Sequence, residues 1–245
     1  MSFDLTGQRI LVTGAAGGIG AAVARVLAGL GARLVLTDRV SCAAQAAPLR
    51  DAGHDVEEIT LDLDSADAVT ELAGRAGDLD GAVLGAGIYR PVDWDSEQWD
   101  DVAAATLATN LMMPMRLARA IAPRLAARGG GRLVLLGSIV ATTGGSFPGV
   151  GPHYAASKGG LHTLVRWLAA RHGGDGVLVN GVAPGVTDTA MVGVHDLTEA
   201  LQRHPLKRAA RPEEIAWPVA FLCSPAASFI SGAILDVNGG AMMRP

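Results

Sequence analysis

Cysteine, aromatic residues and long apolar runs are scarce in this chain of 245 residues. Its two cysteines, Cys42 and Cys223, are too few for a disulfide framework and lack metal-ligand spacing, so we expect ordinary thiols and no metal site. No apolar run reaches the roughly 18 residues of a membrane span, and the N-terminus lacks a basic segment followed by an apolar one. We therefore expect a cytoplasmic protein without a membrane partner.

Dense basic runs are absent as well. The formal net charge is −4 and the sequence pI is near 5.8, so no nucleic-acid partner is expected. Hydrophobic residues make up 49% of the chain, which is enough for a sizeable core. Because α/β sheets of this length often form one domain, and no linker or repeat is visible, we expect a single domain over residues 1–245.

Short apolar runs alternate with longer helical patterns along the chain. The runs do not alternate with polar residues, which is typical of strands buried on both faces of a parallel sheet. Repeated β-α-β order predicts an α/β fold with a doubly wound parallel sheet. The expected strands are Arg9–Thr13, Arg33–Thr37, Val56–Leu61, Gly81–Leu84, Arg132–Leu136, Val177–Val182 and Ala233–Val237. The expected helices are Gly18–Leu30, Ser41–Ala52, Ser65–Arg75, Ser96–Ala127, Tyr154–His172 and Pro212–Cys223, with Ser65 and Ser96 as N-caps.

A glycine stretch joins the first expected strand to the first helix: Thr13-Gly14-Ala15-Ala16-Gly17-Gly18-Ile19-Gly20. Gly14 and Gly18 allow a tight turn and close approach to a phosphate, and Gly20 allows close helix–strand packing. The helix N-terminus then offers N–H groups to a dinucleotide pyrophosphate. An ordinary turn is the alternative for such a cluster. No Gly-Lys-Ser/Thr ending is present, so a nucleoside-triphosphate loop is not supported.

Acidic residues follow the second and third expected strands. Asp38 lies about 20 residues beyond the glycine stretch, where a carboxylate accepts both ribose hydroxyls and repels a 2′-phosphate. This favours NAD(H) over NADP(H). Arg39 could instead bind that phosphate, or be an ordinary solvated arginine. Asp62-Leu63 could flank the adenine, with a helix-capping aspartate as the equal alternative.

The stretch Tyr154-Ala155-Ala156-Ser157-Lys158 places a phenol and an ammonium on one helix face. A tyrosine has a pKa near 10 and is a poor base at neutral pH. We expect the neighbouring ammonium of Lys158 to lower the pKa of Tyr154, so that the phenolate takes an alcohol proton while hydride leaves the carbon. Lys158 can also hold the nicotinamide ribose. Such a pair is common by chance, so further residues must support this interpretation.

Ser138 and Asn110 supply that support. Ser138 follows the expected strand Arg132–Leu136, at the sheet edge where its hydroxyl can polarise a substrate carbonyl. Asn110 interrupts an apolar face of the long expected helix and could bind water or a backbone carbonyl. A satisfied core asparagine is the alternative.

Together these motifs resemble the classical short-chain dehydrogenase/reductase family over essentially the whole chain. Ala86-Gly87, Asn180-x-Val182-x-Pro184-Gly185-x3-Thr189 and Asn238-Gly239-Gly240 match as well. The resemblance implies a Rossmann-type domain with seven strands, catalysis by Ser138, Tyr154 and Lys158, and a relay water held by Asn110. It also implies a homotetramer with the 96–127 and 154–172 helices at one interface. The cofactor residues expected are Gly14, Ala16, Gly17, Gly18, Ile19, Gly20, Asp38, Arg39, Asp62, Leu63, Ala86, Gly87, Asn110, Tyr154, Lys158, Pro184, Gly185, Thr187 and Thr189.

Two departures from the family pattern stand out. Leu84-Gly85 replaces the usual Asn-Asn after the fourth strand, and we expect the lost amides to loosen the ties between strands. The segment between Ser138 and Tyr154 is longer than usual and rich in glycine and proline, which could shape the pocket.

The expected pocket walls are mostly apolar, which suits a hydrophobic or alicyclic secondary alcohol or ketone better than a polyol. His153 could donate a hydrogen bond to a substrate oxygen, or could only cap the helix. The substrate-binding residues expected are Ser138, Val140, Phe147, Val150, His153, Tyr154 and Met191.

Two other functions are compatible with the same fold. A 3-oxoacyl-thioester reductase would need a basic patch for an acidic carrier or CoA, for which Arg203, Lys207 and Arg208 are candidates. Asp38 counts against it, because such reductases usually prefer NADPH. A catalytically inactive NAD-sensing protein is the other alternative, although it would not need the four residues Asn110, Ser138, Tyr154 and Lys158.

Overall fold

Seven parallel strands form one sheet in the computed structural model, which describes residues 3–145, 150–191, 201–202 and 204–243. The strand order is β3-β2-β1-β4-β5-β6-β7, so the direction of winding reverses between β1 and β4. The strands are β1 (Arg9–Thr13), β2 (Arg33–Asp38), β3 (Val56–Thr60), β4 (Gly81–Leu84), β5 (Gly131–Leu136), β6 (Val177–Pro184) and β7 (Ile234–Val237). The predicted doubly wound parallel sheet is therefore confirmed.

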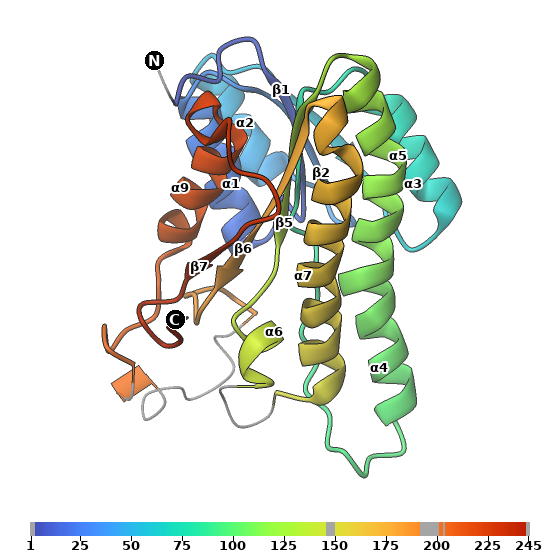
Figure 1. Ribbon diagram of the computed structural model, residues 1–245, viewed down its shortest axis with the longest axis vertical. Helices are drawn as coiled ribbons and strands as arrows, with labels where there is room; N and C mark the ends of the chain where they lie inside the picture. Colours follow the sequence, from blue (N-terminus) through green and yellow to red (C-terminus); the bar gives the residue numbers. More distant parts are fainter. Residues whose placement is uncertain (1–2, 146–149, 192–200, 203, 244–245) are drawn as a thin grey trace.

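Helices cover both faces of the sheet (Figure 1). One face carries α1 (Gly18–Gly29), α2 (Ala43–Asp51) and α9 (Pro212–Cys223). The other carries α3 (Ala66–Arg75), α4 (Trp99–Leu107), α5 (Met113–Ala127) and α7 (Pro152–His172). The described residues also contain four short helical segments: η1 (Ala108–Met112), α6 (Val140–Thr143), η2 (Gly173–Asp175) and η3 (Pro225–Ala227).

Each strand contributes to two hydrophobic cores. Successive side chains point to opposite faces, so Leu11 of β1 packs in the core beneath α3, α5 and α7 while Val12 packs in the core beneath α1 and α9. Both side chains are fully buried. Burial on both faces explains why the strands are apolar without alternation.

The long helix predicted over 96–127 was wrong in two respects. The helix begins at Trp99, and its N-cap is Gln98 rather than Ser96. The Ser96 hydroxyl accepts a hydrogen bond from the Gln98 N–H at 3.2 Å, before the helix begins. The helix is also interrupted by a π-helical turn, η1, which contains Asn110. The predicted N-cap Ser65 is confirmed, because its hydroxyl accepts from the Ala68 N–H at 3.1 Å.

Candidate active site

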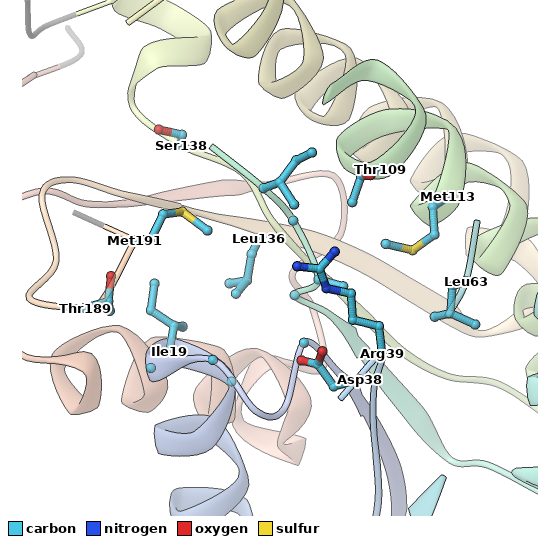
Figure 2. Close-up of a pocket in the computed structure, with 18 of the residues that line it drawn as sticks. Ile19, Asp38, Arg39, Leu63, Thr109, Met113, Leu136, Ser138, Thr189 and Met191 are labelled. Atoms are coloured by element: carbon cyan, nitrogen blue, oxygen red, sulfur yellow. The ribbon is translucent and has the colours of Figure 1, made fainter. Parts of the chain in front are cut away.

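A cavity of about 520 Å³ lies along the carboxyl edge of the sheet, where ligands of such folds bind (Figure 2). Most of the expected cofactor residues line it. These are Gly14, Gly17, Gly18, Ile19, Gly20, Asp38, Arg39, Asp62, Leu63, Ala86, Gly87, Tyr154, Lys158, Pro184, Gly185, Thr187 and Thr189. Ala16 and Asn110, which were also expected there, do not line it, but they form hydrogen bonds with the lining residues Asp38 and Ile88 respectively.

The glycine turn brings backbone against backbone at one end of the cavity. Gly14 has a φ of +72°, and a Cβ there would lie 2.8 Å from the Ala86 Cα. A Cβ on Gly20 would lie 2.1 Å from the Gly14 carbonyl oxygen, and one on Gly18 would lie 2.7 Å from Thr189 Cγ2. No side chain caps α1, whose N-cap is Gly17. The first N–H groups of α1 therefore face the cavity without a side chain in the way, which fits a pyrophosphate group.

Asp38 lies beside this turn at the end of β2. One carboxylate oxygen accepts from the Ala16 N–H at 3.2 Å, and the other accepts from the Val40 N–H at 3.4 Å. These bonds fix the carboxylate next to the glycine turn. Arg39 extends from the same strand end toward the middle of the pocket (Figure 2), and its guanidinium has no ion pair among the residues that the structure describes.

The segment Leu84-Gly85 is hydrogen-bonded to the neighbouring strand β1, although it lacks asparagine amides. The Thr13 hydroxyl oxygen accepts from the N–H groups of Gly85 at 3.0 Å and Ala86 at 3.2 Å, which ties β1 to the end of β4. A Cβ on Gly85 would lie 3.1 Å from Leu136 Cδ1. The Thr13 hydroxyl thus links the two strands, and the packed leucine leaves little room for a side chain at residue 85. The expected loosening remains a prediction.

Asn110 joins the segment after β4 to α7. Its Oδ1 accepts from the Ile88 N–H at 2.8 Å, and its Nδ2 donates to the Ile88 carbonyl at 2.9 Å and to Ser157 Oγ at 3.3 Å. A Cβ on Gly87 would lie 3.2 Å from Asn110 Oδ1 and 3.6 Å from Lys158 Nζ. A glycine at residue 87 therefore lets this buried amide and the buried ammonium lie close to the cavity wall.

Tyr154 and Lys158 lie one turn apart on α7, as predicted. Lys158 Nζ is 5.8 Å from the centre of the Tyr154 ring and donates to the Leu136 carbonyl at 2.9 Å. Burial lowers the pKa of Lys158 to about 8. Ser138, at the end of β5, is 9% exposed and forms a hydrogen bond with Tyr154.

The expectation that the pKa of Tyr154 is lowered was wrong for the protein without a bound cofactor. Burial raises the pKa of Tyr154 to about 12; the hydrogen bond with Ser138 acts in the opposite direction, and nearby Tyr89 adds to the rise. The Tyr89 and Tyr154 rings meet edge to face, with centroids 5.1 Å apart. Removal from water therefore outweighs any help from Lys158, which is itself buried.

Only part of the expected substrate set lines the cavity. Ser138, Tyr154 and Met191 do so, whereas Val140 and Val150 do not, and Phe147 lies outside the described residues. Val140 begins α6 and is turned inward, at 4% exposed. His153 is also buried, and its Nε2 lies 3.1 Å from the Arg90 carbonyl oxygen. Its polar contact is thus with the loop after β4.

Several lining residues were missed from the sequence. Thr109 and Met113 face the cavity opposite Ile19 (Figure 2), and Ala105 precedes them on the same face. Their spacing of four residues along the expected helix could have indicated one face. Arg90 also lines the cavity, and it is the first cationic residue after β4.

Comparison with known proteins identifies the family. Residues 14–242 match a family described as enoyl-(acyl carrier protein) reductase. The chain is 39% identical to cis-4-hydroxycyclohexanecarboxylate dehydrogenase of Sinomonas cyclohexanicum, over 94% of each chain. It is 37% identical to galactitol 2-dehydrogenase (L-tagatose-forming) of Cereibacter sphaeroides, over 97% of this chain and 96% of that one. It is 35% identical to a 3-oxoacyl-[acyl-carrier-protein] reductase of Vibrio cholerae, over 98% and 99%.

A solved structure shows the same family relationship. The crystal structure of a Beutenbergia cavernae protein, assigned as an NAD(P)-dependent gluconate 5-dehydrogenase and holding NADP at low occupancy, superposes with a TM-score of 0.91. The two are 34% identical, and the match covers 98% of both chains. The protein therefore belongs to the classical short-chain dehydrogenase/reductase family, whose members use a nicotinamide cofactor to act on alcohols and ketones.

In the part of the chain that the structure describes, no helix has both the length and the apolar character to cross a bilayer. The same residues contain no group of three or more His, Cys, Asp or Glu side chains placed to hold a metal ion.

Proposed function

We propose that the protein is an NAD(H)-dependent oxidoreductase that interconverts a secondary alcohol and a ketone, with a hydrophobic or alicyclic substrate body. The observation that carries this proposal is one continuous cavity. It is lined at one end by the glycine turn and Asp38, and at the other by Ser138, Tyr154 and Lys158. A dinucleotide lying along this edge would bring its nicotinamide to the hydroxyl groups of Ser138 and Tyr154.

The residues of the chain would move the proton. When bound, the nicotinamide exchanges a hydride with the substrate carbon. In ketone reduction Tyr154, which burial keeps protonated, donates its phenolic proton to the carbonyl oxygen while Ser138 holds that oxygen. In alcohol oxidation the same phenol must lose its proton first, so a positive charge beside it must overcome the effect of burial. Lys158 would also hold the nicotinamide ribose, with Asn110 supporting a relay water.

Tyr154→Phe is the direct test of this role. It removes the proton donor but keeps the ring, so we expect turnover to be lost while NADH still binds in a fluorescence titration. Tyr89→Phe, beside it, is the matched control and should retain turnover. Undiminished turnover by Tyr154→Phe would remove Tyr154 from the mechanism.

Asp38 supports the preference for NAD(H), because its carboxylate is fixed beside the glycine turn and would repel a 2′-phosphate. The Beutenbergia cavernae structure holds NADP instead, so the preference of this protein for NAD(H) needs a direct test. Asp38→Ser should raise kcat/KM for NADP relative to NAD by at least about tenfold, because a like-charge contact is removed. Asp64→Ser, at the end of β3 in the same cavity, is the control. An unchanged ratio in Asp38→Ser would show that Asp38 does not select the cofactor.

A 3-oxoacyl-thioester reductase is the second candidate, favoured by the similarity to the Vibrio cholerae reductase. The expected basic patch gives it little support. Arg208 donates two hydrogen bonds to the Glu214 carboxylate, at 2.7 and 2.8 Å, so its charge is already paired. Arg203 lies outside the described residues. NADPH-dependent turnover of 3-oxoacyl thioesters, without turnover of simple ketones, would replace our first proposal. A protein that binds NADH but turns over neither would be the inactive sensor.

We also propose a cytoplasmic homotetramer with α5 and α7 at one interface. Two large apolar side chains are exposed on these helices, Met115 on α5 at 38% and Trp167 on α7 at 60%. Contact with water is unfavourable for such side chains, and burying them against a second copy of the chain would remove them from water. Light scattering on a sizing column would test the assembly, and a monomer would refute it.

A further inference from the structure

The loop after β4 places a cation at the tyrosine end of the cavity. Arg90 lines the cavity together with Ile88, Ser138 and Tyr154. Its side chain is exposed and forms no hydrogen bond or ion pair with any residue that the structure describes. An arginine that lines the same cavity as these hydroxyls, and has no partner among the described residues, is available for a ligand.

The backbone of this loop is fixed at two points to the elements that carry catalysis. The Asn110 amide holds both the N–H and the carbonyl of Ile88. The His153 ring, next to Tyr154 in the chain, holds the Arg90 carbonyl at 3.1 Å. Because His153 and Tyr154 are neighbours on α7, the base of the Arg90 side chain has a set position relative to the phenol. Such fixing is what specific recognition by a long side chain requires.

The charges that line the cavity are divided between its two ends. The acidic lining residues are Asp38, Asp62 and Asp64, at the ends of β2 and β3 on the glycine-turn side. At the tyrosine end, the described lining residues include no carboxylate. Ile88 and Met191 make the wall there apolar. This end therefore offers an apolar surface, two hydroxyl groups and two cations. The Lys158 ammonium is buried and donates to the Leu136 carbonyl, whereas the Arg90 guanidinium is exposed and unpaired among the described residues.

We propose that the substrate is a hydroxy or oxo carboxylic acid whose carboxylate binds Arg90 at a distance from the reacting carbon. This inference rests on the proposed function and specifies, in addition, that the substrate carries a negative charge. A guanidinium donates two parallel hydrogen bonds to a carboxylate, which fixes both position and orientation. The apolar ring or chain between the two groups lies against the apolar wall. The names of the relatives do not decide the point, because they include an acid dehydrogenase and a dehydrogenase of the neutral polyol galactitol.

The reaction itself is unchanged by this addition. In the reductive direction a bound reduced nicotinamide would supply a hydride to the carbonyl carbon and be oxidised, while Tyr154 would donate its proton to the carbonyl oxygen. The carboxylate takes no part in electron transfer. Arg90 is thus a specificity-determining residue, and its loss should affect KM more than kcat.

The test compares 4-oxocyclohexanecarboxylate with its methyl ester, which keeps the ring and removes the charge. We expect the wild-type protein to reduce the acid with a kcat/KM about 10- to 100-fold above that of the ester, the effect of a charge-assisted hydrogen bond. Arg90→Met should abolish that preference through a higher KM for the acid, with little change for the ester. Arg90→Lys should restore part of it.

Arg171→Met is the matched control, because Arg171 is an exposed arginine in the last turn of α7, at the opposite end of that helix from Tyr154, and it does not line the cavity. Its acid-to-ester ratio should equal that of the wild type. Equal use of acid and ester by the wild type, or a ratio that Arg90→Met does not move, would overturn the inference and leave the proposed function standing. No turnover of either compound, or of cyclohexanone, with NADH or NADPH would overturn both.

Discussion

Lys158 is an ammonium buried inside the protein, and its burial should make the fold less stable than it could be. The side chain is 7% exposed, and its pKa falls from the usual 10.5 to about 8. At about 1.4 kcal/mol for each pH unit, keeping this group charged at pH 7 costs about 3 kcal/mol of folding free energy. Lys158→Met removes the charge and also the hydrogen bond to the Leu136 carbonyl, worth about 1 kcal/mol. We expect the variant to be more stable at pH 7 by about 2 kcal/mol.

The sign of the pH dependence follows from the same shift. Below pH 8 both folded and unfolded chains hold the proton, so the full cost of burial is present. Between pH 8 and pH 10.5 the unfolded chain keeps a proton that the folded chain has released, and the stability of the wild type rises with pH. At pH 9.5 the cost of burial has fallen to about 1 kcal/mol, so the two proteins should be nearly equal in stability.

Urea unfolding at pH 7 and pH 9.5, at one protein concentration and without cofactor, measures the stability difference between the variant and the wild type and its change with pH. Lys207→Met is the control, because Lys207 is the other lysine of the chain and is exposed. Lys207→Met should change the free energy of unfolding only slightly, and by the same amount at both pH values. A stability difference between Lys158→Met and the wild type that does not shrink by about 2 kcal/mol at pH 9.5 would show that the ammonium is not buried as the structure describes.

Two further predictions concern the frame of the site. Thr13→Val should lower the free energy of unfolding by about 2 kcal/mol, because two backbone N–H groups after β4 lose their acceptor, and Thr37→Val, which loses a single donated bond, should cost about 1 kcal/mol in the same urea assay. Gly20→Ala should weaken NADH binding at least about tenfold, because its Cβ would collide with a backbone carbonyl. Gly29→Ala on the same helix meets nothing within 4 Å and should bind NADH normally. Comparable affinity in both alanine variants would refute the steric argument.

The fold could be predicted from the sequence because its signals are local. Apolar runs without alternation identify buried parallel strands, and glycines such as Gly14 and Gly20 are needed wherever backbones touch. The break in the long helix at η1 could not be predicted in this way. It contains Asn110, whose amide bonds to Ile88 and Ser157, residues that lie far from it in the chain.

The site was predictable in its parts but not in its energetics. Spacing placed Tyr154 and Lys158 on one face of a helix, and the structure agrees. The direction of the Tyr154 pKa shift depends on how much water reaches the phenol, which spacing does not report. His153 shows the same limit, because only the folded loop reveals that its ring meets the Arg90 carbonyl.

In the proposed mechanism, the raised pKa of Tyr154 has one physical consequence for the direction of catalysis. At neutral pH the buried phenol keeps its proton, which prepares the site to reduce a ketone without further change. Oxidation must first remove that proton, and a positive charge brought next to the phenol makes this easier. An oxidised nicotinamide carries such a charge and a reduced one does not. In the proposed mechanism, the burial that holds the proton on Tyr154 would thus let the oxidation state of a bound cofactor favour the protonation state that each direction requires.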